Sequence, residues 1–144
     1  MTEDAWATAA LDAPEFLPYL EAAADGHLVI PRCENCNRYQ FPPRAQCRYC
    51  THASFTWPKV TCVGGLYSWT TTYRALAPVL SGSVPLTIAI VTLDLPDPVR
   101  LVGRVNADPS DPRIAIGARM SGEFVPVTSE RRPDNLALTW HLMG

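Results

Sequence analysis

The sequence predicts a mainly β protein in which a helix and a four-cysteine segment precede a small five-stranded barrel or sandwich. Three observations support this prediction. Two C-x2-C pairs lie within residues 31–57, short runs of β-branched and aromatic residues follow them, and most of the 14 prolines stand at the ends of such runs. We therefore divide the chain into an N-terminal arm and helix (1–30), a metal-binding ribbon (31–57) and a barrel domain (58–144).

The first 30 residues are expected to form an arm followed by one helix. Residues 1–12 show no clear pattern, whereas Asp12 and Glu15 have the spacing of a capping box. An interior proline costs a helix about 3 kcal/mol, so Pro18 indicates a start between Glu15 and Pro18, with this proline in the first turn. Gly26 is a plausible stop, and residues 28–30 are expected to form a short strand.

Five strands are predicted after Pro58. They are Leu66–Tyr73, Leu86–Leu93, Val99–Val105, Met120–Val127 and Leu136–His141. In the third of these runs apolar residues and glycine alternate with Arg100, Val102 and Arg104, so the two arginines are expected on the face opposite Leu101.

The four cysteines of the ribbon have the spacing of a zinc site. Cys33 and Cys36 form one C-x2-C pair, and Cys47 and Cys50 form the second after ten intervening residues. Two residues between ligands let both sulfurs of a pair face one metal ion, and two such turns complete a tetrahedron. The sequence therefore predicts one structural zinc ion per chain, bound by Cys33, Cys36, Cys47 and Cys50.

Four thiolates close the coordination sphere of zinc, so this metal is not expected to take part in catalysis. Four arginines flank the cysteines. They are Arg32, Arg38, Arg44 and Arg48. Their expected role is to offset the excess negative charge of the cluster, and ligand binding is the alternative.

The remaining cysteine and histidines suggest no catalytic centre. Cys62 is expected to be a buried apolar residue rather than a nucleophile. His52 lies close to Cys50 and is an alternative ligand, although four cysteines already suffice. His27 and His141 have no nearby partner in the sequence, so a structural or surface role is expected for both. We therefore predict no catalytic residues, and no enzyme activity for the chain on its own.

The formal net charge of −2 is unevenly distributed. Residues 1–30 carry −6, residues 31–59 carry +4, and residues 60–144 are neutral. Eleven of the 12 basic residues are arginine, which prefers defined contacts with carboxylates or phosphates over diffuse binding along a nucleic-acid backbone. This composition argues against nucleic acid as the main partner.

The hydropathy pattern and the first residues of the chain indicate the cellular compartment. No apolar run approaches the roughly 18 residues of a membrane span, and the acidic start Met1-Thr-Glu-Asp4 lacks the pattern of a signal peptide. We therefore expect a cytoplasmic protein without a membrane partner, in which the thiols stay reduced.

Short motifs along residues 14–127 occur in the order found in a known family. They are Gly26-His-Leu, Pro31-Arg-Cys33, Phe41-Pro-Pro-Arg44, Gly64-Gly-Leu-Tyr-Ser-Trp-Thr70, Pro85, Val99-Arg-Leu101, Ile116-Gly-x-Arg-Met120 and Phe124. With the cysteine pairs, they make the chain resemble a thiolase-associated family, formerly a domain of unknown function. Its members join an N-terminal rubredoxin-like zinc ribbon to a C-terminal OB-fold. Residues 128–144 match no part of this pattern.

The resemblance implies a zinc ribbon over residues 31–57 and a five-stranded OB-fold barrel over residues 58–144. It also implies a noncatalytic accessory subunit that stabilises a thiolase-like partner, an acyl-CoA thiolase or a steroid side-chain retro-aldolase, in a hetero-oligomer. The partner would supply the catalytic residues, and this chain would help form the acyl-CoA site, with a CoA ester at the interface. Residues 1–30 and 128–144 are candidate docking surfaces, with a solvated face as the open alternative.

Two other functions remain open from the sequence. Zinc ribbons and OB-folds also bind single-stranded nucleic acid, and Tyr67, Trp69 and Tyr73 are expected on one strand face where they could stack on bases. The same face could equally belong to the core. An enzyme that acts alone on CoA esters is the third possibility.

A final hypothesis concerns Arg100 and Arg104, which share a predicted strand face. Both side chains could reach CoA phosphates, while solvation or pairing with acidic residues is the common alternative.

Overall fold

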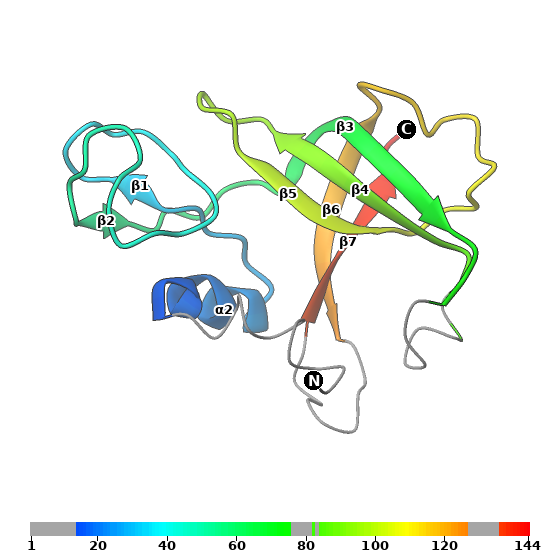
Figure 1. Cartoon of the computed structure of the whole chain (residues 1–144), viewed down its shortest axis with the longest axis horizontal. Helices are drawn as coiled ribbons and strands as arrows, with labels where there is room; N and C mark the ends of the chain where they lie inside the picture. Colours follow the sequence, from blue (N-terminus) through cyan, green and yellow to red (C-terminus); the bar gives the residue numbers. More distant parts are fainter. Residues whose placement is uncertain (1–13, 76–81, 83, 127–135) are drawn as a thin grey trace. The chain divides into compact units, whose positions relative to one another are not determined.

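The computed structural model describes residues 14–75, 82, 84–126 and 136–144 (Figure 1). The expectations for residues 1–12, including a cap at Asp12, lie outside this part of the chain, as do those for Val127 and for residues 128–135. Two compact units form: Met1–Thr61 with Leu95–Val99, and Cys62–Asp94 with Arg100–Gly144.

The N-terminal helix begins where the proline indicates. A 3-10 turn, η1 (Pro14–Phe16), leads into α2 (Leu17–Ala24), which carries its proline within the first two positions. A proline is tolerated there because the first N–H groups of a helix have no internal acceptor. Phe16 is the N-cap residue and makes no side-chain capping bond. The helix ends at Ala24 with Asp25 as its C-cap, and the predicted stop, Gly26, follows with a φ of +79°, a left-handed conformation that glycine adopts without strain.

The expected strand over residues 28–30 is replaced by weaker pairing. Val29 forms an isolated bridge with Lys59, and the first two-residue strands are β1 (Arg32–Cys33) and β2 (Phe55–Thr56), which pair antiparallel. Pro31 and Pro58 explain the interruption, because neither residue has an N–H group to donate to a continuous ladder.

Aromatic side chains pack the helix against the segment between the cysteine pairs. The ring centroid of Phe41 lies 6.1 Å from that of Phe16 and 5.4 Å from that of Tyr19. The three aromatic side chains are half-buried, and Ala23 on the helix and Ile30 after it are buried. This small apolar cluster, together with the cysteine site, forms the interior of the first unit.

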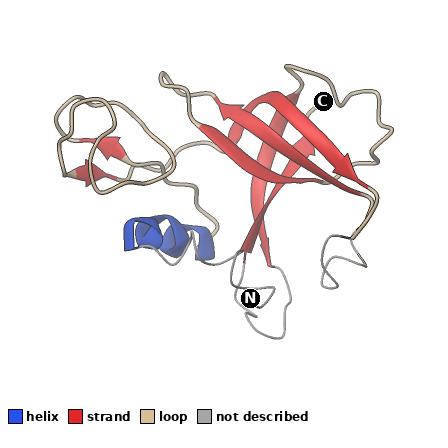
Figure 2. Cartoon of the chain, in the orientation of Figure 1, coloured by secondary structure: helices blue, strands red, loops and turns tan. Residues whose placement is uncertain are grey.

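The second unit is a closed barrel, so the sequence prediction of a barrel is confirmed (Figure 2). Its strands are β3 (Val63–Thr72), β4 (Leu86–Leu93), β5 (Arg100–Val105), β6 (Arg119–Pro126) and β7 (Leu136–Leu142). Their order around the barrel is β3-β4-β5-β7-β6, and pairing of β3 with β6 closes it. All pairs are antiparallel except β5 and β7, which run parallel and place Arg104 opposite Thr139.

The barrel interior follows the predicted alternation of side chains. Thr87, Ala89, Val91 and Leu93 of β4 are buried, and their neighbours along the strand are more exposed. On β5 Leu101 is buried while Arg100 is exposed, as the sequence pattern predicts. The five strands thus share one apolar interior, and each fully buried aliphatic side chain contributes about 1.5–3 kcal/mol to stability.

Trp140 of β7 is fully buried in this interior. A β-carbon added at Gly103 would lie 2.8 Å from its Cδ1 atom, and one added at Gly122 would lie 2.8 Å from its Cζ3 atom. The two glycines therefore leave the space that the indole ring fills.

A β-bulge in β3 changes the face assigned to the aromatic residues. The pairing with β4 shifts between Leu66 and Ser68, so that Trp69 stands opposite the buried Ala89. Tyr67, at the bulge, instead lies under the exposed Arg100. The extra residue breaks the period of two on which the expected shared face rested, yet both Tyr67 and Trp69 are exposed to solvent, at 51% and 37%.

Candidate functional site

The four predicted zinc ligands meet at one point in the first unit. The Sγ atoms of Cys33, Cys36, Cys47 and Cys50 all lie within 4.8 Å of one another. Those of Cys33 and Cys50 are 3.6 Å apart, and those of Cys36 and Cys47 are 3.7 Å apart. Among the described residues, the cluster consists of these four cysteines and does not include His52.

Each cysteine pair lies on the same kind of backbone turn. The N–H of Asn37 donates to the carbonyl of Cys33 at 3.0 Å, and the N–H of Thr51 donates to the carbonyl of Cys47 at 2.9 Å. Asn37 and Thr51 have φ angles of 62° and 66°, and both directly follow the second cysteine of their pair. The two C-x2-C motifs thus form two matching left-handed turns.

Backbone amides also point at the sulfurs. The N–H groups of Asn35 and Tyr49 each lie 3.4 Å from the Sγ of the first cysteine of their pair, Cys33 and Cys47. Hydrogen bonds of this kind favour the thiolate, which is the form that binds a metal. The second residue inside each motif therefore helps to prepare the sulfur as a ligand.

The proton affinities of two of the thiols differ. For Cys36 a backbone hydrogen bond at Arg38 favours the thiolate, but burial and the neighbouring thiols outweigh it and raise the pKa to about 11. Hydrogen bonds from Asn35 and the backbone of His52 lower the pKa of Cys50 to about 6. The Cys50 thiol is therefore easily ionised in the metal-free cluster, while the Cys36 thiol keeps its proton at neutral pH.

The donor set fits a zinc ion. Tetrahedral zinc with bonds of about 2.3 Å requires sulfurs about 3.8 Å apart, close to the 3.6 Å and 3.7 Å found here. Four thiolates leave no coordination position for water or a substrate. The geometry therefore suits a structural metal rather than a catalytic one.

Arg38 has a partner that the sequence analysis missed. Its Nε donates to Asp97 at 2.9 Å, and its guanidinium lies 3.5 Å from the ring centroid of Tyr49. Asp97 also accepts a bond of 2.9 Å from the N–H of Tyr39. The hydrogen bond with Asp97 is the first cause of the raised pKa of Arg38, and Cys36 contributes least. No local pattern marks Asp97, because it is 59 residues from Arg38.

Cys62 belongs to the barrel unit and is not one of the four clustered cysteines. Its Sγ would be 2.5 Å from a β-carbon placed at Gly122. Burial raises the pKa of its thiol to about 11, so little nucleophilic thiolate forms at neutral pH. The raised pKa fits a residue that is not a nucleophile, but the side chain is half-buried rather than buried as predicted.

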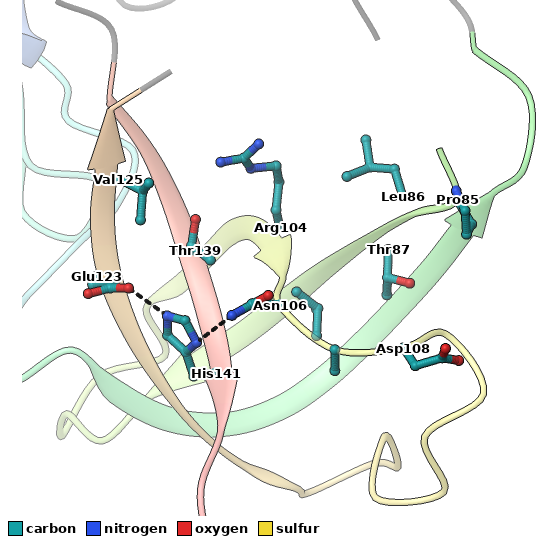
Figure 3. Close-up of a pocket in the computed structure, with 12 residues that line it drawn as sticks. Pro85, Leu86, Thr87, Arg104, Asn106, Asp108, Glu123, Val125, Thr139 and His141 are labelled. Carbon is teal, nitrogen blue, oxygen red and sulfur yellow. Dashed lines mark hydrogen bonds and ion pairs between the residues drawn. The ribbon is translucent and has the colours of Figure 1, made fainter. Parts of the chain in front are cut away.

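The barrel carries a pocket of about 650 Å³ that the sequence analysis did not foresee (Figure 3). Arg104 of β5, Glu123 of β6 and both Thr139 and His141 of β7 line it. His141 Nε2 lies 2.8 Å from Glu123 Oε1, and His141 Nδ1 lies 3.3 Å from Asn106 Nδ2. The three strands bring these residues together from distant parts of the sequence.

The two arginines of β5 have different surroundings. Arg100 lies 4.0 Å from the ring centroid of Tyr67, and its Nε donates to Thr92 Oγ1 at 3.3 Å. Arg104 lines the pocket, and Arg100 does not. A joint contact of both arginines with one phosphate ligand stays a hypothesis.

Within the described residues, no helix has the length and apolar character needed to cross a bilayer.

Comparison with known proteins places these features in a family. The ChsH2 rubredoxin-like zinc ribbon domain matches residues 20–56, and the ChsH2 C-terminal OB-fold domain matches residues 57–125. No match was found among curated proteins.

Two solved structures share the fold. The Ltp2-ChsH2(DUF35) aldolase is 22% identical, with a TM-score of 0.77, over 90% of this chain and 95% of that one. A DUF35-family protein of unknown function from Sulfolobus solfataricus is 14% identical, with a TM-score of 0.60, over 97% and 95%. The chain belongs to the ChsH2 family, in which a rubredoxin-like zinc ribbon is followed by a C-terminal OB-fold domain.

Proposed function

We propose that this chain is a noncatalytic accessory subunit that binds one structural zinc ion and stabilises a thiolase-like partner. The observation that carries the proposal is the four-thiolate cluster in a chain of the ChsH2 family, since its coordination is closed to substrate. The partner would supply the catalytic residues of an acyl-CoA thiolase or a steroid side-chain retro-aldolase. This chain would help to form the acyl-CoA site, with a CoA ester at the interface.

The partner class is supported by a likeness of fold. The solved structure with a TM-score of 0.77 is described as an Ltp2-ChsH2(DUF35) aldolase, which names two components. We infer a hetero-oligomer of the same kind for this chain. The division into residues 1–30, 31–57 and 58–144, and a cytoplasmic location, are parts of the same proposal.

Zinc binding is tested by metal analysis of the purified chain. We expect one zinc ion per chain, and its loss in the double variant Cys33→Ser with Cys47→Ser. Cys62→Ser is the matched control, because this cysteine lies outside the cluster and should leave the zinc content unchanged. A metal-free chain with full thermal stability would contradict the structural role.

The accessory role is tested by affinity purification of the tagged chain from its native host, with native mass spectrometry. We expect a thiolase-like protein at a fixed stoichiometry. Acyl-CoA cleavage should require both proteins together, and the double cysteine variant should recover less of the partner than the Cys62→Ser control. Turnover of CoA esters by this chain alone, or its recovery as a monomer in every preparation, would overturn the proposal.

A further inference from the structure

The barrel pocket contains two buried hydrogen-bonding groups without partners. Arg104 Nε and Thr139 Oγ1 are both inaccessible to solvent, and neither has a hydrogen-bond partner among the described residues. Thr139 is only 7% exposed. Buried polar atoms are rarely left unpaired, because each one costs stability, so such atoms deserve a specific explanation.

Strand pairing brings these two groups together. Arg104 on β5 and Thr139 on β7 are partners in the parallel ladder, and both line the same pocket (Figure 3). A guanidinium N–H can only donate, and a hydroxyl can also donate. Neither atom now touches solvent, so an oxygen acceptor in the pocket would satisfy both groups once their side chains rotate toward it.

The charges in the pocket indicate the kind of acceptor. Its two carboxylates already have partners: Glu123 binds His141, and Asp108 accepts bonds of 2.8 Å and 2.5 Å from the backbone and hydroxyl of Ser110. Those bonds hold the pKa of Asp108 below its ordinary value, so it stays ionised and engaged within its own turn. Arg104 forms no ion pair with either carboxylate, so its guanidinium is a positive charge without an oppositely charged partner among the described residues, as the Asp108 carboxylate is a negative one.

The rest of the lining fits an organic molecule. A volume of about 650 Å³ is within the range of small-molecule sites. Leu86 and Val125 supply apolar surface, and the contacts of His141 with Glu123 and Asn106 fix the polar wall.

We propose that this pocket binds a small organic molecule through an oxyanion, either a carboxylate or a phosphate, that is received by Arg104 and Thr139. The inference is independent of the zinc site and of the accessory role, because every residue it uses belongs to the barrel unit.

Titration calorimetry on the full zinc-loaded chain tests the proposal with three probes: hexanoate, its neutral counterpart hexanamide, and inorganic phosphate. Hexanoate or phosphate should bind, and whichever binds more tightly identifies the source of the oxyanion. Hexanamide should bind more weakly than hexanoate. Nuclear magnetic resonance shifts of Thr139 and His141 should follow the same titration and locate the site.

Variants connect binding to the two groups. Arg104→Gln should weaken oxyanion binding roughly tenfold, the usual size of one charge-assisted hydrogen bond. Thr139→Val should weaken it less while keeping the fold, because valine has nearly the same shape and removes an unpaired oxygen. Arg100→Gln is the matched control on the same strand. This variant should bind the oxyanion probe with the same affinity as the unaltered chain.

Three results would overturn the proposal: no binding of hexanoate or phosphate, equal affinity for hexanoate and hexanamide, or unchanged affinity in both Arg104→Gln and Thr139→Val.

Discussion

The Nε atom of Arg38 lies 2.9 Å from Oδ1 of Asp97, which joins the segment Leu95–Val99 to the cysteine ribbon within the first unit. The carboxylate is 12% exposed, and its other oxygen accepts a bond from the N–H of Tyr39. Burial alone would raise the pKa of Asp97, but the bonds from Tyr39 and Arg38 outweigh it and hold the pKa below its ordinary value of 3.8.

The first prediction concerns Asp97→Asn and its dependence on pH. Because the folded pKa is depressed, the stabilisation by the carboxylate is present above its ordinary pKa and is lost as the pH falls through the folded value. We expect the variant to lose about 1 kcal/mol at neutral pH. Urea unfolding should show this difference shrinking below about pH 4.

Asp94→Asn is the matched control, since Asp94 also pairs with an arginine, Arg119, but its side chain is 53% exposed. Its effect should be smaller than that of Asp97→Asn. Zinc content is followed in the same samples, because acid also protonates the cysteines. Equal effects of the two variants at neutral pH would contradict a special role for Asp97.

Removal of zinc should unfold the ribbon and leave the barrel largely intact. Metal binding to such segments contributes on the order of 10–16 kcal/mol, whereas the barrel has an apolar interior of its own. Hydrogen exchange after treatment with a chelator should show lost protection at the amides of Cys33 and Cys47 and retained protection in β4 and β5. Full protection of both turns without metal would count against this account.

Alanine should destabilise the barrel at the two glycines beside Trp140, Gly103 and Gly122. At Gly103 the new β-carbon would lie 2.6 Å from the backbone oxygen of Leu138 as well as 2.8 Å from the indole, so neither neighbour can simply rotate away. We expect Gly103→Ala and Gly122→Ala each to cost about 1–3 kcal/mol, or more where backbone must move. Thermal unfolding measures this loss.

Gly65→Ala on β3 serves as the control for those variants, because the nearest atom to its β-carbon, the oxygen of Gly117, lies 4.0 Å away. Its unfolding temperature should lie within a degree or two of that of the unaltered chain. A loss of 1 kcal/mol would lower this temperature by about 4–8 °C in a typical small domain. If Gly65→Ala lost as much stability as Gly103→Ala, the lack of space beside Trp140 would not explain the destabilisation.

Binding to single-stranded nucleic acid should be weak. The bulge breaks the alternation between Tyr67 and Trp69 on which the expected stacking face rested, and residues 60–144 carry no net charge to attract a polyanion. Fluorescence anisotropy with oligothymidylate should show no binding in the micromolar range. Micromolar affinity that falls with added salt would instead favour a nucleic-acid-binding module.

The sequence by itself was sufficient to predict local features. The spacing of Cys33, Cys36, Cys47 and Cys50 predicted the cluster, because each C-x2-C turn is a short-range structure. Proline and glycine positions predicted the limits of α2, and alternation predicted the strands and the opposite faces of Arg100 and Leu101. These features depend on residues within a few positions of one another.

The contacts between residues far apart in the sequence depend on the tertiary structure. Asp97 contacts Arg38 across 59 residues of sequence, and Arg104 lies opposite Thr139 because β5 pairs with β7. No local sequence pattern predicts either contact. The bulge at Tyr67 likewise depends on how β3 fits β4, and its extra residue interrupts the alternation on which the face assignment rested. The barrel pocket exists for the same reason: four strands from separate parts of the chain contribute its polar groups.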